Sequence, residues 1–507
     1  MVVKILSAGI RGIEAFMVEL EMRASRGHPG WTTVGLPEHE VREGKERVLS
    51  ALQAIGFEIP QNKITLNLAP ADVRKEGTAF DLPIAMGIVA SRDLTFQKDL
   101  QDYLLVGELS LNGNLRPIRG ALATALLAQS AQKKGLIVPE ENLGEASLCK
   151  NIEVWGAKNL GQVVEYFCGN NYLAPAKPIA YEPTNLHLDF KEVWGQQGVK
   201  RVLEIAAAGF HPTLLVGPPG SGKSMLAKRL PSILPALNHE EMLHLINLKS
   251  FMTTLSSHGT TNLKISRPFR SPHHSISYAG MVGGGSLPKP GEVTMAHHGI
   301  LFLDELPEFK KSVLECLRQP LEDKKITISR AKESFTFPTD FLLIAAMNPC
   351  PCGNYGYEPW LECSCLASDI KRYRQKLSGP LLDRIDLKTD VAPVPYGEME
   401  KGDGQEPSLT IRHRIEACHQ IQEDRFKDSP YRFNSQMDNE AIKRYCQLGA
   451  DGKKILAKAM EKFRLSARSY TRILKVARTI ADLAQVESIE SAHLLEAIQY
   501  KINDRVI

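Results

Sequence analysis

The chain has 507 residues, of which 43% are hydrophobic and 24% are charged. This length exceeds what one hydrophobic core usually organises, and the composition excludes a disordered or fibrous protein. The net charge of +4 permits an anionic partner without requiring one, so any contact with a nucleic acid would be local. Charges interrupt the apolar residues near the N-terminus and no apolar run has membrane-spanning length, so we expect a cytoplasmic protein.

Residues 1–170 alternate short apolar strands with amphipathic helices. AFMVELEM and KITLNL have the character of strands, whereas EVREGKERVLSALQAIG has helical periodicity. This pattern predicts a mixed α/β domain. Residues 171–189 contain three prolines and little helical periodicity, so we expect a linker there.

Residues 190–395 return to strand and helix alternation. The apolar segments TLLVG, GILFLDE and FLLIAAMN are separated by helical stretches, which predicts a parallel sheet covered by helices. Residues 396–507 begin with a charged, glycine-containing run and continue mostly as amphipathic helix, whose last helix we expect to start at Ser491 or Ser488. The sequence therefore predicts an α/β core followed by a helical lid.

A complete phosphate-binding loop follows the strand TLLV. The segment GPPGSGKS matches G-x-x-x-x-G-K-[ST] between a predicted strand and a predicted helix, which is the context this motif requires. The pattern predicts that backbone N–H groups face the phosphates of ATP, that Lys223 reaches the β- and γ-phosphates, and that Ser224 binds Mg²⁺. The nucleotide-binding residues are Gly217, Pro218, Pro219, Gly220, Ser221, Gly222, Lys223 and Ser224.

Two acids end the strand GILFLDE. Because ligands bind at the carboxyl edge of parallel sheets, we expect Asp304 to hold Mg²⁺ and Glu305 to act as the general base toward water. An acidic helix cap is the structural alternative. Asn348 ends the strand FLLIAAMN, where it would orient the water or sense the γ-phosphate, or simply open a turn. For Arg384 in SGPLLDRIDL, stabilisation of the transferred phosphate and a local ion pair with Asp383 or Asp386 both remain open.

A cysteine cluster follows Asn348 in the pattern C-x-C-x₁₀-C-x-C. Four thiolates suit a tetrahedral Zn²⁺ site, although the C-x-C spacing is tighter than usual, and four reduced thiols in a loop are the alternative. We favour a structural zinc held by Cys350, Cys352, Cys363 and Cys365. Two histidine pairs, at 273–274 and 297–298, lack metal-ligand spacing, so we expect hydrogen bonding or DNA contact there.

With these motifs in this order, the chain resembles the magnesium-chelatase-like group of the AAA+ superfamily that includes the bacterial ComM (YifB) proteins. The resemblance covers essentially the whole chain and rests on the segments GHPGWTTVGLPEHEVREGKERV, NLAPADVRKEGTAFDLPIA, RPFRSPHHSISYAGMVGGG, NPCPCGNYG, LSGPLLDRIDL and YTRILKVARTIADL. It implies a homohexamer with ATP between subunits that acts as a DNA helicase in branch migration during natural transformation.

The resemblance also implies residue roles. Arg384 would be the arginine finger that enters a neighbour's site, and Arg468 the second sensor arginine, with Arg472 as its competitor. A helix-2 insert over about residues 267–296 and a hairpin in KITISRAKESFTF would grip DNA. Mobile loops with a few cations suit contacts to phosphates without sequence preference. The DNA-contact candidates are Arg267, Arg270, Lys289, Arg330 and Lys332; solvated loops with scattered charge are the alternative.

The N-terminal domain looks like the Lon protease domain, an S5-like α/β fold. A Lon-type protease needs a serine activated by a lysine, but Ala79 stands near the serine position and Leu122 at the lysine position. We therefore expect no proteolysis. A DNA helicase is the favoured function, and a chelatase-like remodeller of a protein partner is the alternative.

Overall fold

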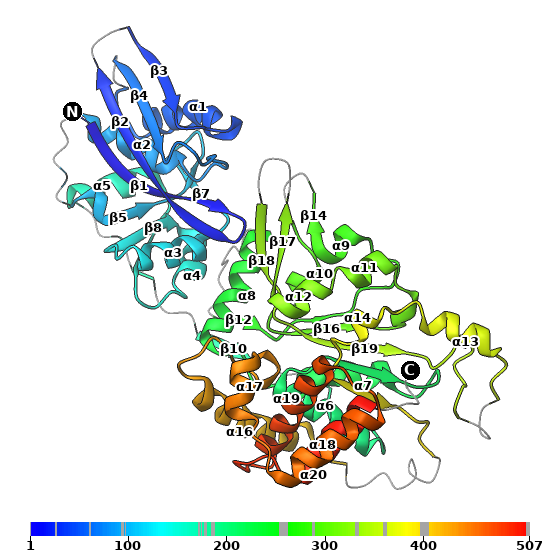
Figure 1. Ribbon diagram of the computed structural model, residues 1–507. Coiled ribbons are helices and arrows are strands. Elements are labelled where there is room, and N and C mark those ends of the chain that lie inside the picture. The colour runs from blue at the N-terminus through cyan, green and yellow to red at the C-terminus, as the bar shows by residue number, and fades with distance from the viewer. Residues whose placement is uncertain are drawn as a thin grey trace. The chain divides into compact units, whose positions relative to one another are not determined.

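The computed structural model describes residues 2–25, 28–59, 62–92, 96, 98–170, 173, 175–176, 180–183, 188–252, 262–285, 289–329, 334–357, 362–395 and 405–502. These form two compact units, one of residues 1–183 with 238–265 and one of residues 184–237 with 266–507. In Figure 1 the first unit is mostly blue and cyan, and the second runs from green to red. No helix in the described part of the chain is long and apolar enough to cross a membrane.

The first unit is built on a mixed seven-stranded sheet in the order β3-β4-β2-β1-β5-β8-β9. β1 and β2 pair along their whole length in antiparallel register, and β5, β8 and β9 extend the sheet in parallel. Alternating apolar residues of these strands form the core with the buried faces of helices. The strands are β1 Val2–Arg11, β2 Glu14–Ser25, β3 Gly30–Val34, β4 Lys63–Ala69, β5 Tyr103–Leu105, β8 Gly135–Pro139 and β9 Glu153–Ala157. The helices are α1 His39–Ala54, α2 Asp81–Ser91, α3 Ala121–Ser130, α4 Leu143–Ala146 and α5 Leu160–Cys168.

Residues 238–265 belong to the first unit, although the sequence prediction places them inside the core of residues 190–395. Their helix α8, His239–Met252, is fixed by polar contacts. Asn247 donates from its side-chain amide to the carbonyl oxygen of Ile13 at 2.8 Å, and Ser250 accepts from the backbone N–H of Gly120 at 3.0 Å. The following strand β12, Asn262–Ile265, pairs in parallel with β10, Ala180–Pro183, which lies in the predicted linker.

The second unit is built on a five-stranded parallel sheet in the order β13-β16-β19-β11-β20. The central strands are completely buried because their residues are almost all apolar, as expected for a sheet covered on both faces. The expected α/β class is thereby confirmed. The strands are β11 Thr213–Val216, β13 Phe269–Arg270, β16 Ile300–Leu303, β19 Leu342–Met347 and β20 Leu387–Asp390.

Helices cover this sheet and continue past it as a helical subdomain. Of the helices in this part of the chain, α6 Gln197–Gly209 lies against β20 and α7 Lys223–Arg229 against β19. The others are α11 Lys311–Glu315, α12 Arg318–Asp323, α13 Ala367–Arg374 and α14 Gly379–Leu382. A hairpin of β17 Lys325–Ser329 and β18 Ser334–Pro338 follows α12 directly. Residues 267–296, where the sequence predicts a helix-2 insert, contain the short elements α9 Tyr278–Val282, β14 Gly283–Gly284, β15 Lys289–Pro290 and α10 Glu292–Met295. The last helices are α16 Ser408–Phe426, α17 Asn439–Tyr445, α18 Ala450–Lys462, α19 Ala467–Leu483 and α20 Ser491–Ile502.

Candidate nucleotide site

The predicted phosphate loop lies at the carboxyl edge of the parallel sheet, between β11 and α7. Gly220 and Gly222 have φ angles of +77° and +91°, which glycine adopts at little cost, so the backbone can curl into α7. Gly217 lies so close to the next strand that a Cβ atom would come within 2.4 Å of the carbonyl oxygen of Val391. The loop therefore requires glycine for both its conformation and its close packing.

Lys223 folds back onto its own loop. Its Nζ donates to the carbonyl oxygens of Gly217 and Pro218 at 2.8 Å each and lies 3.3 Å from Oδ1 of Asn348. Burial lowers the pKa of Lys223, and the charges of Asp304 and Asp390 oppose that shift. Lys223 follows β11 and the phosphate loop, and Asn348 follows the neighbouring strand β19. The two residues thus meet at the edge of the sheet where the terminal phosphates are expected to bind.

Ser224 and Asp304 form a pair of oxygen donors beside this lysine. The hydroxyl of Ser224 donates to Oδ2 of Asp304 at 2.5 Å, which links the first turn of α7 to the end of β16. A hydroxyl and a carboxylate are the hard oxygen ligands that Mg²⁺ accepts, usually together with phosphates and water. The two donors fit the magnesium site that the sequence predicts.

Glu305 projects from the same edge in a strained backbone conformation. Its φ angle is +52°, uncommon for a residue with a side chain, and its side chain is 59% exposed. Its Oε2 lies 3.1 Å from Nδ1 of His274, which follows the adjacent strand β13. The sequence prediction missed this contact, because it depends on β13 and β16 being neighbours in the sheet.

The predicted arginines lie at the opposite edge of the sheet. Leu387 of β20 pairs with Thr213 at the start of β11, whereas Asp390 pairs with Val216 at its end, next to the phosphate loop. Arg384 precedes β20, so it lies at the amino edge. Its side chain is only 4% exposed and its Nη2 lies 2.6 Å from Oε1 of Glu322. Arg384 therefore does not approach the phosphate loop of its own chain.

The two candidates for the second sensor differ in their surroundings. Arg468 is 48% exposed and its Nη2 lies 3.8 Å from the same Glu322 oxygen that Arg384 contacts. Arg472 instead pairs with the buried Asp386 and donates to the carbonyl oxygen of Arg384 at 2.8 Å. Burial alone would raise the pKa of Asp386, but Arg472, His211 and Lys501 hold it well below its usual range. Arg472 thus serves a buried ion-pair network, which leaves Arg468 as the sensor candidate.

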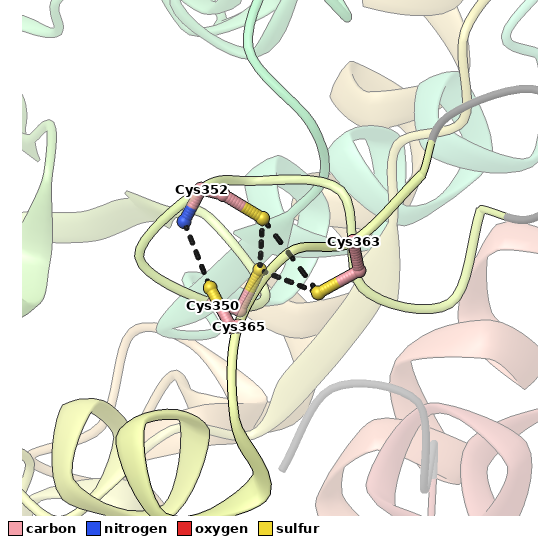
Figure 2. A group of neighbouring side chains, drawn as sticks. All are labelled: Cys350, Cys352, Cys363 and Cys365. Carbon is pink, nitrogen blue, oxygen red and sulfur yellow. Dashed lines mark hydrogen bonds between the residues drawn. The ribbon is translucent and has the colours of Figure 1, made fainter.

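The four clustered cysteines converge on one point (Figure 2). The Sγ atoms of Cys350 and Cys352 are 3.3 Å apart, and that of Cys363 lies 3.8 Å and 3.6 Å from them. Cys365 completes the group, whose sulfur atoms all lie within 4.8 Å of one another. A tetrahedral site with Zn–S bonds of 2.3 Å has sulfur atoms about 3.8 Å apart, so the cluster has the size that Zn²⁺ requires.

The cysteine loop packs against the phosphate loop. Gly353, at φ +90°, lies so near Pro219 that an added Cβ would come within 2.4 Å of the proline ring. Tyr357 of the same loop hydrogen-bonds through its hydroxyl to Asp390, whose charge acts on Lys223. The cysteine loop therefore contacts both the phosphate loop and Asp390 beside it.

Comparison with known proteins places this site in a family. The model of the magnesium chelatase subunit ChlI matches residues 189–399, its C-terminal model matches residues 405–501, and a further ChlI model matches residues 20–142. The competence protein ComM of Haemophilus influenzae is 42% identical over 510 residues, covering 99% of this chain and 98% of that protein. The chain belongs to the ComM/YifB family of magnesium-chelatase-like AAA+ proteins.

Other relatives agree with this assignment. The uncharacterised YifB protein of Escherichia coli is 41% identical over 497 residues, which covers 98% of this chain and 96% of that protein. Lon protease 2 of Bacillus subtilis is 27% identical over 243 residues, 43% of this chain and 40% of the protease. The resemblance to the ComM/YifB family inferred from the sequence is confirmed.

At the two positions where the sequence analysis expects the Ser and Lys of a Lon-type protease, this ComM/YifB-family chain has Ala79 and Leu122. Leu122 is completely buried at the start of α3, and its backbone N–H donates to the carboxylate of Glu145 at 2.9 Å. Ala79 offers only its backbone, through which its carbonyl accepts from the N–H of Gly107 at 2.9 Å. Both positions therefore support the fold, and the lack of proteolysis stays a prediction.

The predicted DNA-contact residues fall into three groups. Arg267 donates to the carbonyl oxygens of Pro235, Ala236 and His298, and Arg270 forms a bidentate pair with Glu292 at 2.6 and 2.7 Å. Lys289 is exposed on β15. Arg330 and Lys332 lie outside the described residues. Arg267 and Arg270 thus bind groups of the protein itself. Lys289, Arg330 and Lys332 remain as candidates for contact with DNA.

Proposed function

We propose that this chain hydrolyses ATP in a homohexameric ring and uses the energy to drive branch migration of DNA during natural transformation. The main support for this proposal is that Lys223, the Ser224–Asp304 pair and Glu305 lie together at one edge of the sheet. Lys223 would exchange its carbonyl partners for the β- and γ-phosphates, and Glu305 would take the proton of the attacking water. Mg²⁺, held through Ser224 and Asp304, would neutralise charge on the phosphates.

The position of the arginines supports catalysis between subunits. Arg384 and Arg468 meet at Glu322, at the edge of the sheet opposite their own phosphate loop. An arginine finger accelerates hydrolysis by stabilising charge on the transferred phosphoryl group, which requires direct contact. Only another chain's nucleotide can meet that requirement for Arg384, so the site is complete only in an oligomer.

Contact with DNA rests on two kinds of support. ComM of Haemophilus influenzae, a near full-length relative, is a competence protein. The exposed Lys289 and the predicted hairpin cations Arg330 and Lys332 suit sequence-independent contacts to phosphates, which weaken steeply as salt rises.

A mobile four-way junction with fluorophore-labelled arms tests this function. We expect the purified chain to convert the junction into its product duplexes with ATP and Mg²⁺, because a ring that moves on one arm displaces the crossover. Lys223→Ala, which removes the phosphate contact, provides the control and should abolish conversion. Absence of conversion by the wild type, under conditions where it hydrolyses ATP, would contradict branch migration.

A chelatase-like remodeller of a protein partner is the second candidate. It is favoured by the ChlI family models, which match residues 189–399 and 405–501. Such a protein would hydrolyse ATP through the same residues but would respond to its protein partner and not to DNA. The response of ATP hydrolysis to DNA therefore separates the two candidates.

We further propose that the cysteine cluster holds a structural Zn²⁺ that keeps the phosphate loop in place. Protein purified without chelator should contain one Zn²⁺ per chain, and Cys350→Ser or Cys365→Ser should remove it. Because Gly353 packs on Pro219, zinc loss should also weaken binding of a fluorescent ATP analogue by about tenfold, equivalent to a loss of about 1.4 kcal/mol.

Cys168→Ser, outside the cluster, is the matched control and should retain both zinc and affinity. Metal analysis and equilibrium titration measure the two quantities separately. Purified protein with substoichiometric zinc would argue for four reduced thiols, and zinc loss without change in nucleotide affinity would remove the mechanical link to the phosphate loop.

A further inference from the structure

A single carboxylate joins Arg384, the proposed arginine finger, and Arg468, the candidate second sensor. Glu322, on α12, places Oε1 2.6 Å from Nη2 of Arg384 and 3.8 Å from Nη2 of Arg468. Burial alone would raise the pKa of Glu322, but the hydrogen bond and charge of Arg384, with the charges of Arg468 and Arg472, bring it below its usual value. Glu322 is therefore ionised at neutral pH and forms ion pairs with both guanidinium groups.

In this arrangement Arg384 cannot act on another chain. Its side chain is 4% exposed, Nη1 donates to the carbonyl oxygen of Pro380 at 2.6 Å, and Nη2 is held by Glu322. Its Nε is buried without a hydrogen-bond partner among the described residues. Because an arginine finger must touch the phosphate that it stabilises, Arg384 has to leave Glu322 before it can serve a neighbour.

Glu322 lies just before the hairpin to which the family resemblance assigns DNA contact. The helix α12 ends in a tight reversal at Lys324, with φ of +55°, and β17 begins at the next residue. The base of the hairpin is fixed to this reversal, since the N–H of Thr339 donates to the carbonyl oxygen of Lys324 at 2.8 Å. The Nζ of Lys324 also lies 3.4 Å from Asp340. Only one turn of chain thus separates Glu322 from the hairpin.

We propose that Glu322 is a latch that holds Arg384 and Arg468 on their own subunit until DNA engages the β17–β18 hairpin. A carboxylate bound by guanidinium groups imitates phosphate oxygens, so a neighbour's γ-phosphate can replace it in the same geometry. Movement of the hairpin weakens the contacts of Glu322, and the released arginines complete the neighbouring site. The latch rests on the proposed function and adds to it the link between DNA contact and hydrolysis.

Glu322→Gln tests the latch, because the amide keeps the size of the side chain but loses its charge. We expect ATP hydrolysis without DNA to rise about fivefold, the upper range for loss of a partly exposed ion pair. DNA should then stimulate hydrolysis by a correspondingly smaller factor, because the arginines are already released without DNA. The double variant Glu322→Gln, Arg384→Ala should hydrolyse ATP no faster than Arg384→Ala alone, since the latch acts through the arginines.

Glu315→Gln is the matched control, because Glu315, the last residue of α11, also forms a partly exposed ion pair, with Arg318 of α12 at 2.9 Å. Its rates should equal those of the wild type. Equal loss of the basal and DNA-stimulated rates in Glu322→Gln, with unchanged thermal stability, would show that Glu322 holds the arginines in their working position and would overturn the latch. Unchanged rates would overturn it as well.

The wild type measured in parallel separates this inference from the proposed function. A wild type that hydrolyses ATP but ignores DNA contradicts the DNA motor. The latch is then still judged by the DNA-free rate of Glu322→Gln, which must exceed that of the wild type.

Discussion

Replacement of Glu305 by Gln is expected to lower kcat for ATP hydrolysis by at least about a hundredfold while nucleotide binding stays intact. A glutamine has the same size but accepts no proton, so the variant loses general-base catalysis, which contributes roughly 10²- to 10⁴-fold. Lys223, Ser224 and Asp304 remain in place to bind the nucleotide. Steady-state hydrolysis gives kcat, and titration with a fluorescent ATP analogue gives the Kd.

Glu308→Gln is the control for this prediction, because Glu308 is a nearby exposed acid that pairs with Lys376 at 3.0 Å. It should hydrolyse ATP at the wild-type rate. If Glu305→Gln kept more than a tenth of the wild-type kcat, the assignment of Glu305 as the general base would be wrong.

Arg384→Ala is expected to lower kcat by about a thousandfold, the lower range for removal of an arginine finger. The loss should be repaired when this variant is mixed with Lys223→Ala, which is inactive alone. In a mixed ring, the Lys223→Ala chain still carries Arg384 and lends it to the intact phosphate site of its neighbour. Recovery of hydrolysis in the mixture is thus the signature of catalysis between subunits.

Exchange of subunits labelled with a donor and an acceptor fluorophore confirms that the two variants enter the same assemblies. Mixed assemblies without recovered hydrolysis would show that Arg384 serves its own chain. Near wild-type activity of Arg384→Ala alone would instead assign this residue to its local ion pair with Glu322.

The parts of the site that lie within one continuous segment could be predicted from the sequence. The phosphate loop is such a segment, since its glycines, Lys223 and Ser224 stand at fixed spacing between a strand and a helix. Asp304 and Glu305 followed from the rule that ligands bind at the carboxyl ends of parallel strands. The four cysteines followed from their clustering alone, and the structure brings their sulfur atoms together.

Contacts between distant segments could not be predicted in this way. His274 meets Glu305 only because β13 and β16 are neighbours in the sheet, which periodicity does not reveal. Glu322 meets Arg384 because α12 and the residues before β20 lie at the same edge. The helix α8 carries no signal that it belongs with the first unit, since its fixing contacts to Ile13 and Gly120 come from far along the chain.

The most direct test of an ATP-driven DNA motor is ATP hydrolysis by the purified chain without DNA, with single-stranded DNA and with a four-way junction. The wild type should be stimulated by DNA, most by the junction. Glu305→Gln should show no hydrolysis, and the double variant Arg330→Ala, Lys332→Ala should hydrolyse ATP without responding to DNA. Hydrolysis that depends on Glu305 but is the same with every DNA would contradict the motor and favour a remodeller of a protein partner.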